Sequence, residues 1–312
     1  MRKTLFIAVA LILSGAVSSV SAQDFGKFAS LQEIIEAARS HQTPQPEAAA
    51  SGQDEAAESE RLLELERQHM PPEQGEVEQA GLEPGAPKPY YSIVKAAGRP
   101  YLQQHDWFLN PGEVILTFDD GPDPSRTQTF VNVLKENNVP ALFFVLGSRL
   151  ESASGKALAA AESQSGSMVG VHGYYHATPS GKPFTSVGWE RVRDDLAKTI
   201  KLVTEATGRR PKYFRPPYGN IRAGDARRIY SELGLIPVGW TVDSNDWKTK
   251  DPADLFGNIA RYLRARGKGI VLMHDVHPQS RAVIVKLIPW LKENGFKIVS
   301  PDRLKEAFEK QS

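Results

Sequence analysis

Two adjacent carboxylates follow an apolar run, where the chain reads Val-Ile-Leu-Thr-Phe-Asp-Asp-Gly-Pro from Val114 to Pro122. The apolar part is typical of a buried strand, and the Gly-Pro pair turns the backbone directly after it. Asp119 and Asp120 are too close together for both to ionise in a dry pocket, unless a cation binds one of them or one carries a proton. The pattern therefore predicts a strand that ends at a polar site.

Two histidines, His172 and His176, stand four positions apart in a glycine-flanked stretch that is typical of a loop. With Asp120 they would place two imidazoles and one carboxylate around an ion, leaving positions for water and substrate. This ligand set is typical of catalytic zinc, and it also suits non-haem iron oxygenases. Oxygenases usually carry the carboxylate close in sequence to the first histidine, unlike this chain. The absence of cysteine excludes thiolate ligands and disulfides.

Other polar residues could transfer protons at such a site. Asp119 could take a proton from an attacking water, and Arg215 could keep Asp119 ionised beside the cation. His274 could protonate a leaving group, with Asp246 orienting its imidazole. Each residue also has a structural explanation, and Arg215 taken alone could be an ordinary surface charge.

Three more residues could shape the binding of a substrate. Tyr218 follows two prolines that stiffen the backbone, so its N–H could donate to an oxyanion. Trp247 and Leu272 could line the pocket with apolar surface, although both could also be core residues. Asp243 stays open between a site residue and a structural one, whereas Asp275 is expected to fix its loop by hydrogen bonding.

Strand-length and helical segments alternate regularly from Tyr90 onwards and would position these residues. The alternation predicts a parallel sheet, and the length from Tyr90 to Ser312 fits a (β/α) barrel. The expected strands are 114–118, 141–145, 168–172, 212–215, 237–242, 270–274 and 296–299. The expected helices are 127–137, 155–163, 189–207, 223–233, 253–266, 281–294 and one that begins near 302. Because the polar clusters all follow strands, and parallel strands end on one face, the clusters should meet there.

The N-terminal part of the chain has a different character. Arg2 and Lys3 precede an apolar run at 5–17, and small residues follow as far as Ala22. This pattern predicts a secretory signal peptide at 1–22, since the run is too short and too rich in small residues for a membrane anchor. We therefore expect an exported protein, in the periplasm or the medium, with no membrane span in the mature chain.

Residues 23–89 are predicted to be a disordered, low-complexity acidic linker with one short helix at 30–40. Between positions 47 and 88 the chain has eleven acidic and three basic residues, whereas 31 basic and 23 acidic residues follow. A solvated spacer is the favoured interpretation. The alternatives are a tail that folds back on the basic domain at 90–312, or a domain drawn to an anionic polymer.

Taken together, the polar clusters resemble those of the polysaccharide deacetylases, carbohydrate esterase family four, with their NodB-type homology domain. The resemblance covers roughly 112–304 and rests on five motifs in the family's order. They are Thr117-Phe118-Asp119-Asp120-Gly121-Pro122, His172-Gly173-Tyr174-Tyr175-His176, Arg215-Pro216-Pro217-Tyr218-Gly219, Asp243-Ser244-Asn245-Asp246-Trp247 and Leu272-Met273-His274-Asp275. The second motif departs from the family's pattern, which has Ser or Thr in place of Gly173 to brace the histidine loop.

The resemblance implies a distorted (β/α) barrel, usually with seven strands, and gives each site residue a role. By this resemblance Asp119 would be the general base, tuned by Arg215, and His274 would be the general acid, paired with Asp246. Asp120, His172 and His176 would be the metal ligands. Tyr218 would donate to the oxyanion, while Trp247 and Leu272 would form the pocket for the acetyl group. One divalent metal ion is expected, zinc in the first place, with cobalt, manganese or nickel as alternatives.

The sequence thus predicts an exported, metal-dependent hydrolase of carbon–nitrogen bonds. It would remove the N-acetyl group from N-acetylglucosamine units of peptidoglycan, chitin-type or poly-N-acetylglucosamine chains and release acetate. The alternatives are an O-acetyl xylan esterase and a catalytically silent glycan-binding module of the same fold. The expected partner is an N-acetylated glycan and not a nucleic acid, and the sequence identifies no protein partner.

Overall fold

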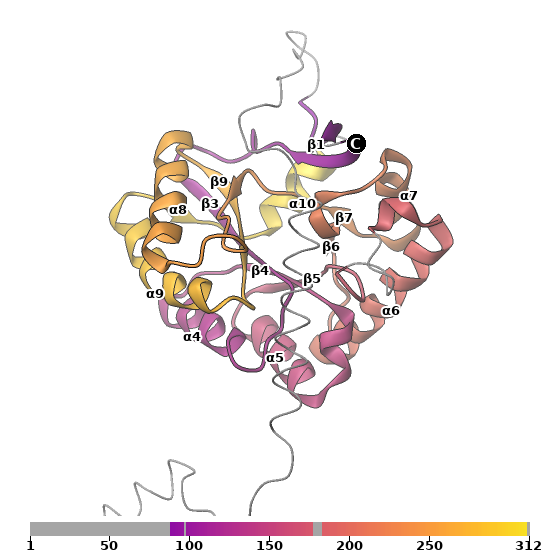
Figure 1. Cartoon of the computed structure of the whole chain (residues 1–312), viewed down its shortest axis with the longest axis horizontal. Helices are drawn as coiled ribbons and strands as arrows, with labels where there is room; N and C mark the ends of the chain where they lie inside the picture. Colours follow the sequence, from indigo (N-terminus) through magenta and orange to yellow (C-terminus); the bar gives the residue numbers. More distant parts are fainter. Residues whose placement is uncertain (1–87, 97, 177–182, 311–312) are drawn as a thin grey trace, which may run out of the picture. The chain divides into compact units, whose positions relative to one another are not determined.

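A computed structural model describes residues 88–96, 98–176 and 183–310 of the chain (Figure 1). The predicted signal peptide, the short helix at 30–40 and nearly all of the predicted linker lie outside these residues. Within the described ranges, no helix is both long and apolar enough to span a bilayer.

A parallel sheet forms the centre of the described part, as predicted. Its strands follow the order β7-β6-β5-β4-β3-β9-β8, and β10 pairs with the first residues of β3. The strands are β3 (Glu113–Asp119), β4 (Leu142–Val145), β5 (Met168–Val171), β6 (Tyr213–Phe214), β7 (Ile236–Pro237), β8 (Val242–Asp243), β9 (Gly269–His274) and β10 (Lys297–Ile298). Every residue of β3 is buried, because Val114 and Phe118 pack in one apolar cluster while Ile115 packs in another.

Helices surround this sheet (Figure 1) and follow its strands in the predicted alternation. They are α4 (Thr127–Asn137), α5 (Ala153–Gln164), α6 (Trp189–Thr207), α7 (Ala223–Leu233), α8 (Pro252–Arg266), α9 (Pro278–Glu293) and α10 (Asp302–Glu309). The predicted bounds of α4, α6 and α7 are confirmed to the residue. Local capping explains several ends: the Asp251 side chain accepts the first free N–H groups of α8, and Gly208 ends α6 in the left-handed conformation.

The prediction of a single strand at 237–242 is wrong, because this segment forms two short strands that pair with different neighbours. Its first part, β7, pairs with β6, and its second part, β8, pairs with β9. Only residues 238–241 separate these two strands, which lie at the two ends of the sheet path. The sheet therefore curls until one short segment joins its ends. This is the predicted distorted (β/α) barrel, with seven strands if β7 and β8 count as one.

An antiparallel hairpin that was not predicted precedes the barrel. It consists of β1 (Tyr91–Ala96) and β2 (Arg99–Gln104), with Val94 opposite Tyr101. Leu102 is fully buried and packs with Val171 and Phe214 of the barrel. The hairpin is therefore part of the folded domain rather than a continuation of the linker.

Candidate active site

Seven of the ten predicted site residues line one cavity of about 30 Å³ at the carboxyl ends of the strands. They are Asp119, His172, His176, Tyr218, Trp247, Leu272 and His274. The other three, Asp120, Arg215 and Asp246, are buried and each lies within hydrogen-bonding or ion-pairing distance of a lining residue. Pro216 and Trp240 complete the lining. Sequence reasoning missed Trp240, because it lies inside the predicted strand 237–242 and nothing local distinguishes it from a core residue.

Asp120, His172 and His176 converge on one point. Oδ1 of Asp120 lies 3.4 Å from Nε2 of His172 and 3.6 Å from Nε2 of His176. A tetrahedral ion with bonds of about 2.1 Å holds its ligand atoms about 3.4 Å apart, so these side chains fit a zinc-sized ion. Oδ1 of Asp120 accepts no hydrogen bond from any described residue. A buried carboxylate oxygen in that state is costly unless a cation neutralises it.

The surroundings keep His172 and Asp120 in the protonation states that a cation binds. The backbone carbonyl of Arg215 accepts a hydrogen bond from Nδ1 of His172 at 2.8 Å, which leaves Nε2 facing Asp120. Burial lowers the pKa of His172 to about 3, although Asp120 opposes the shift, so the imidazole is neutral near pH 7. Burial would raise the pKa of Asp120, but the attraction of His176 and His172 in their protonated forms outweighs burial and holds that pKa below its usual range.

A tight turn shapes the strand end that carries both aspartates. Asp120 has a left-handed φ of 73°, and its N–H donates to the carbonyl of Phe144 at 3.1 Å. A side chain at Gly121 would collide with the carboxylate of Asp275, because a Cβ there would lie 2.3 Å from it. The hydroxyl of Thr127 donates to the same carboxylate. Asp275 therefore fixes its loop by hydrogen bonding, as predicted.

Asp119 is placed to act as a base. Its Oδ1 accepts a hydrogen bond from Nη1 of Arg215 at 2.8 Å, and its Oδ2 lies 3.7 Å from Nε2 of His172. Burial raises the pKa of Asp119 to about 6, with Arg215 and His274 opposing the shift. A carboxylate with a pKa in this range can both accept and release a proton near neutral pH.

Arg215 is fully buried, and its guanidinium links Asp119 to the segment that closes the barrel. It donates to the hydroxyl of Thr117 at 2.7 Å and to the carbonyl of Gly239 at 2.7 Å. A weaker contact of 3.4 Å joins Nε to the carbonyl of Val238. A buried cation needs such partners, and here one ion pair and two strong neutral acceptors supply them.

Asp246 and His274 form a hydrogen-bonded pair on the neighbouring strand ends. Oδ1 of Asp246 accepts from Nδ1 of His274 at 2.7 Å, and His274 lines the cavity. Oδ2 of Asp246 accepts from the backbone N–H of His274 at 2.7 Å and from the hydroxyl of Ser280. This arrangement fixes the orientation and tautomer of the imidazole.

A second cluster of metal-ligand types, Asp246, His274 and His277, adjoins the first. The two clusters differ in how far the protein itself satisfies the carboxylate. Both oxygens of Asp246 already accept hydrogen bonds, whereas Oδ1 of Asp120 accepts none from the described residues. The chemistry of the donor sets therefore favours an ion at Asp120 and a proton-transferring pair at Asp246.

The three residues predicted to contact the substrate all line the cavity. Tyr218 lies in the short 3₁₀ turn η4 (Pro217–Gly219) with a φ of 58°, and its ring meets that of His176 at 4.4 Å between centroids. Trp247 and Leu272 are nearly fully buried and present apolar surface to the cavity. Asp243 does not line the cavity; its carboxylate accepts the N–H of Asn245 at 2.8 Å and serves the turn.

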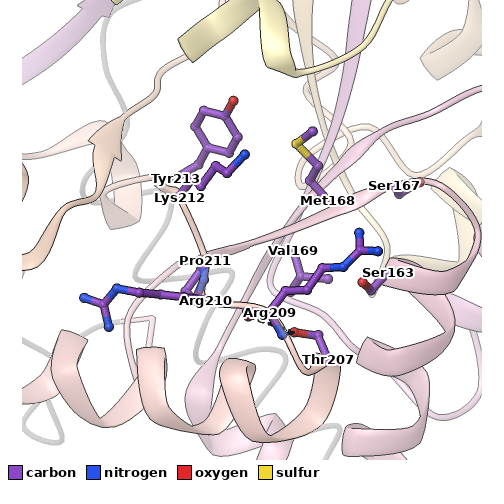
Figure 2. Close-up of a pocket in the computed structure, with 10 residues that line it drawn as sticks. All are labelled: Ser163, Ser167, Met168, Val169, Thr207, Arg209, Arg210, Pro211, Lys212 and Tyr213. Atoms are coloured by element: carbon purple, nitrogen blue, oxygen red, sulfur yellow. Dashed lines mark hydrogen bonds between the residues drawn. The ribbon is translucent and has the colours of Figure 1, made fainter.

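A larger cavity, of about 110 Å³, lies at the amino ends of β5 and β6 and holds none of the predicted site residues (Figure 2). Arg209 and Arg210 stand beside it, just after the end of α6, where positive charge offsets the helix dipole. Figure 2 shows Arg209 extending toward Ser163 and Arg210 pointing the other way, and Arg210 donates to the carbonyl of Leu233. The contact with Leu233 and the end of α6 explain Arg210 without a ligand.

A family model described as polysaccharide deacetylase matches residues 109–238. A peptidoglycan-N-acetylglucosamine deacetylase of Bacillus cereus (strain ATCC 14579) is 31% identical over 195 residues, which are 61% of this chain and 67% of that protein. The peptidoglycan-N-acetylglucosamine deacetylase PgdA of Listeria monocytogenes is 35% identical over 191 residues, 61% of this chain. The matched part spans 38% of the length of that Listeria protein.

A similar solved structure is described as a CE4 family pseudoenzyme from Bacillus anthracis. It superposes with a TM-score of 0.56 at 27% sequence identity, over 62% of this chain and 66% of that one. The similarity thus extends to proteins named as deacetylases and to one named as a pseudoenzyme, so the residues of the cavity must decide which kind of protein this chain is.

Proposed function

This chain belongs to the polysaccharide deacetylase family, and we propose that it is an exported, metal-dependent hydrolase of N-acetyl groups on a glycan. The substrate class is a polysaccharide or oligosaccharide that contains N-acetylglucosamine, as in peptidoglycan, chitin or poly-N-acetylglucosamine. One observation carries the proposal: a base, an acid and a set of metal ligands all meet at a single cavity. Metal-assisted hydrolysis of an acyl bond needs these three functions within one small space.

Asp119 and Tyr218 would carry the first half of the reaction. A divalent ion held by Asp120, His172 and His176 would supply Lewis-acid chemistry at the acetyl carbonyl and the attacking water. Asp119 takes the proton of the water as its oxygen bonds to the carbonyl carbon. The backbone N–H of Tyr218 donates to the oxygen that becomes negative.

His274 would carry the second half. As the carbon–nitrogen bond breaks, Nε2 of His274 gives a proton to the departing nitrogen, so the products are acetate and a free amine. Asp246 holds the opposite ring nitrogen and stabilises the imidazolium before that transfer. Trp247 and Leu272 exclude water from the acetyl methyl group and limit the size of the acyl group.

The test is acetate release from N-acetylglucosamine oligomers and peptidoglycan, measured before and after metal removal by a chelator. Restored turnover on return of zinc, cobalt, manganese or nickel supports the proposal and ranks the metals. Activity that persists without metal contradicts it.

Two alternatives rest on the same cavity. An O-acetyl xylan esterase would need the same base and metal ligands, so acetylated xylan belongs in the substrate panel, and preferential turnover of xylan would favour it. A silent glycan-binding module is disfavoured because every position for acid, base and ligand is filled. Measurable glycan affinity without turnover under all four ions would favour the module.

Export is proposed from the N-terminal pattern at 1–22 and from the glycans that the relatives are named for. Fractionation of cells that produce the full chain, with the N-terminus of the product sequenced, tests it. Recovery in the periplasm or medium with a cut after Ala22 is expected.

A further inference from the structure

The turn that carries Tyr218 holds two successive residues in the left-handed conformation. Tyr218 has a φ of 58° and Gly219 a φ of 69°. Glycine adopts this conformation freely, but a tyrosine there costs about 1 to 2 kcal/mol. Two hydrogen bonds within the turn, from Gly219 to Pro216 at 2.8 Å and from Asn220 to Pro217 at 3.1 Å, set its shape. Contacts from outside the turn must therefore help to hold Tyr218 in place.

The hairpin β1–β2 supplies such contacts. The carbonyl of Pro100 accepts the N–H of Ile221 at 3.1 Å, and Tyr101 forms an isolated bridge with Asn220. The ring of Tyr101 packs on Gly219 so closely that a Cβ there would lie 2.2 Å from the ring. The left-handed residue after Tyr218 must therefore be glycine both for its backbone and for this ring.

The same ring also contacts the wall of the cavity. Tyr101 and Trp240 meet edge to face, with 5.8 Å between ring centroids, and Trp240 lines the cavity. Gln104, at the end of β2, accepts the N–H of Gly239 at 3.0 Å, next to Trp240. The hairpin thus contacts two parts of the active site that are far apart in sequence, the Tyr218 turn and the closing segment.

The hairpin is itself anchored, so it can transmit this support. Leu102 is fully buried, and the amide of Gln104 donates to the carbonyl of Tyr90 at 2.8 Å. The hairpin precedes the part that the family model matches, which begins at residue 109. Its contribution is therefore additional to the five motifs.

We propose that Tyr101 is a positioning residue that holds the Tyr218–Gly219 turn and Trp240 in the arrangement the reaction needs. The proposal rests on the proposed function. Without the ring, Gly219 can leave the left-handed region and Tyr218 can relax with it, which moves its N–H away from the acyl oxygen. An oxyanion contact strengthens as the tetrahedral state forms, so its loss lowers kcat more than it raises KM.

The experiment compares Tyr101→Ala, Tyr101→Leu and Tyr101→Phe in the full, metal-loaded chain. Removal of a whole oxyanion donor costs about 100- to 1,000-fold in kcat, so displacement of one is expected to cost about 10- to 100-fold in Tyr101→Ala. Tyr101→Leu should show a smaller loss of kcat, and it replaces Tyr101→Ala in the comparison if that variant does not fold. Tyr101→Phe retains the ring and should stay near the wild type. Val94→Ala is the matched control, because Val94 is the cross-strand neighbour of Tyr101 in the same hairpin.

A second readout is independent of turnover. Hydrogen exchange at the amides of Gly219 and Asn220, which close the turn, should quicken in Tyr101→Ala and stay unchanged in Tyr101→Phe and Val94→Ala. Unchanged exchange, or quickened exchange with wild-type kcat, overturns the positioning role. If the wild-type chain releases no acetate from any substrate, that result counts against the proposed function alone, while the exchange data still decide whether Tyr101 holds the turn.

Discussion

The carboxylate of Asp195 accepts a hydrogen bond from the backbone N–H of Tyr174, with 2.8 Å between Oδ1 and the nitrogen. Tyr174 lies midway between His172 and His176, so this contact from α6 braces the loop of both histidines. A side chain at Gly173 would not fit, because its φ is 97° and a Cβ would lie 2.8 Å from the carbonyl oxygen of Tyr175. Asp195 thus braces the loop where the related family pattern uses Ser or Thr.

Loss of the Asp195 brace should weaken metal binding. We expect Asp195→Ala to raise the dissociation constant for zinc about tenfold, within the range for residues that orient ligands. Asp195→Asn keeps an acceptor oxygen and should stay near the wild type. Competition with a chromophoric chelator measures the affinity. Asp194→Ala, at an exposed neighbouring position, is the control, and an equal loss there would contradict a specific brace.

Removal of Asp120 should abolish metal binding and turnover together. The carboxylate is the one anionic member of its cluster, so Asp120→Ala leaves only the two histidines to hold an ion. Acetate release should fall by more than about 100-fold, the upper end of effects from groups that only orient ligands. Metal content by elemental analysis is the paired measurement. Asp254→Ala, a change on the exposed start of α8, should alter neither quantity.

Disruption of the Asp246–His274 pair should slow the chemistry but spare the metal. Asp246→Asn keeps the shape but cannot stabilise an imidazolium, so we expect kcat to fall about 100- to 10,000-fold with metal content unchanged. Ser280→Ala, which removes one donor to the same carboxylate, should cost much less. Retention of full kcat in Asp246→Asn would assign the acid role elsewhere.

The pH profile should report the ionisation of Asp119. A base acts only when ionised, so kcat/KM should fall about tenfold per unit as the pH drops below the pKa of Asp119. Burial raises that pKa to about 6 against the pull of Arg215. A bound cation would lower it, so the acid limb should lie at or below about 6. Steady-state rates across that limb, with metal content checked at each pH, measure it; a rate that rises on acidification would exclude Asp119 as the base.

Much of the fold and the site could be predicted because their signals are local. An apolar run followed by polar residues identifies each strand end, and the parallel arrangement brings those ends to one face. The ten predicted residues do meet around one cavity, although their roles stay predictions until turnover is measured. The features that were missed depend on partners distant in sequence. Asp195 belongs to an ordinary amphipathic helix pattern, and the break in 237–242 reflects a change of strand partner.

The hairpin β1–β2 was not predicted, for a related reason. Its strands show no clean alternation of apolar and polar residues, and in the structure most of their residues are half-buried. Gly98 and Pro100 are also typical of turns rather than of strands, and they lie soon after the stretch that was assigned to the linker. Only packing against the barrel gives the segment its structure.

Stability should also depend on a carboxyl group that takes no part in the chemistry. Glu162 is fully buried, and neither of its carboxylate oxygens has a hydrogen-bond partner among the described residues. Burial raises its pKa well above the usual value, and Asp275 adds to the shift. The folded state therefore keeps a proton that the unfolded chain loses above about pH 4.3, so the free energy of unfolding falls as the pH rises, by up to about 1.4 kcal/mol per unit.

Glu162→Gln removes that proton equilibrium and should be more stable than the wild type near neutral pH, but not under acidic conditions. Chemical denaturation at several pH values gives the difference in unfolding free energy between the two chains. Glu136→Gln, at an exposed position of α4, should show no such trend. Parallel pH profiles for the wild type and Glu162→Gln would contradict the assignment.

Arg215 contacts both the proposed base, Asp119, and the segment that joins the two ends of the sheet. A lineage that abandons catalysis can lose an ion ligand or a proton donor and still fold. Loss of this guanidinium would also take the donor from the carbonyl of Gly239 where the barrel closes. Inactive descendants of such a barrel are therefore expected to shed their metal-binding histidines first and to keep this arginine, with its partner Asp119, longest.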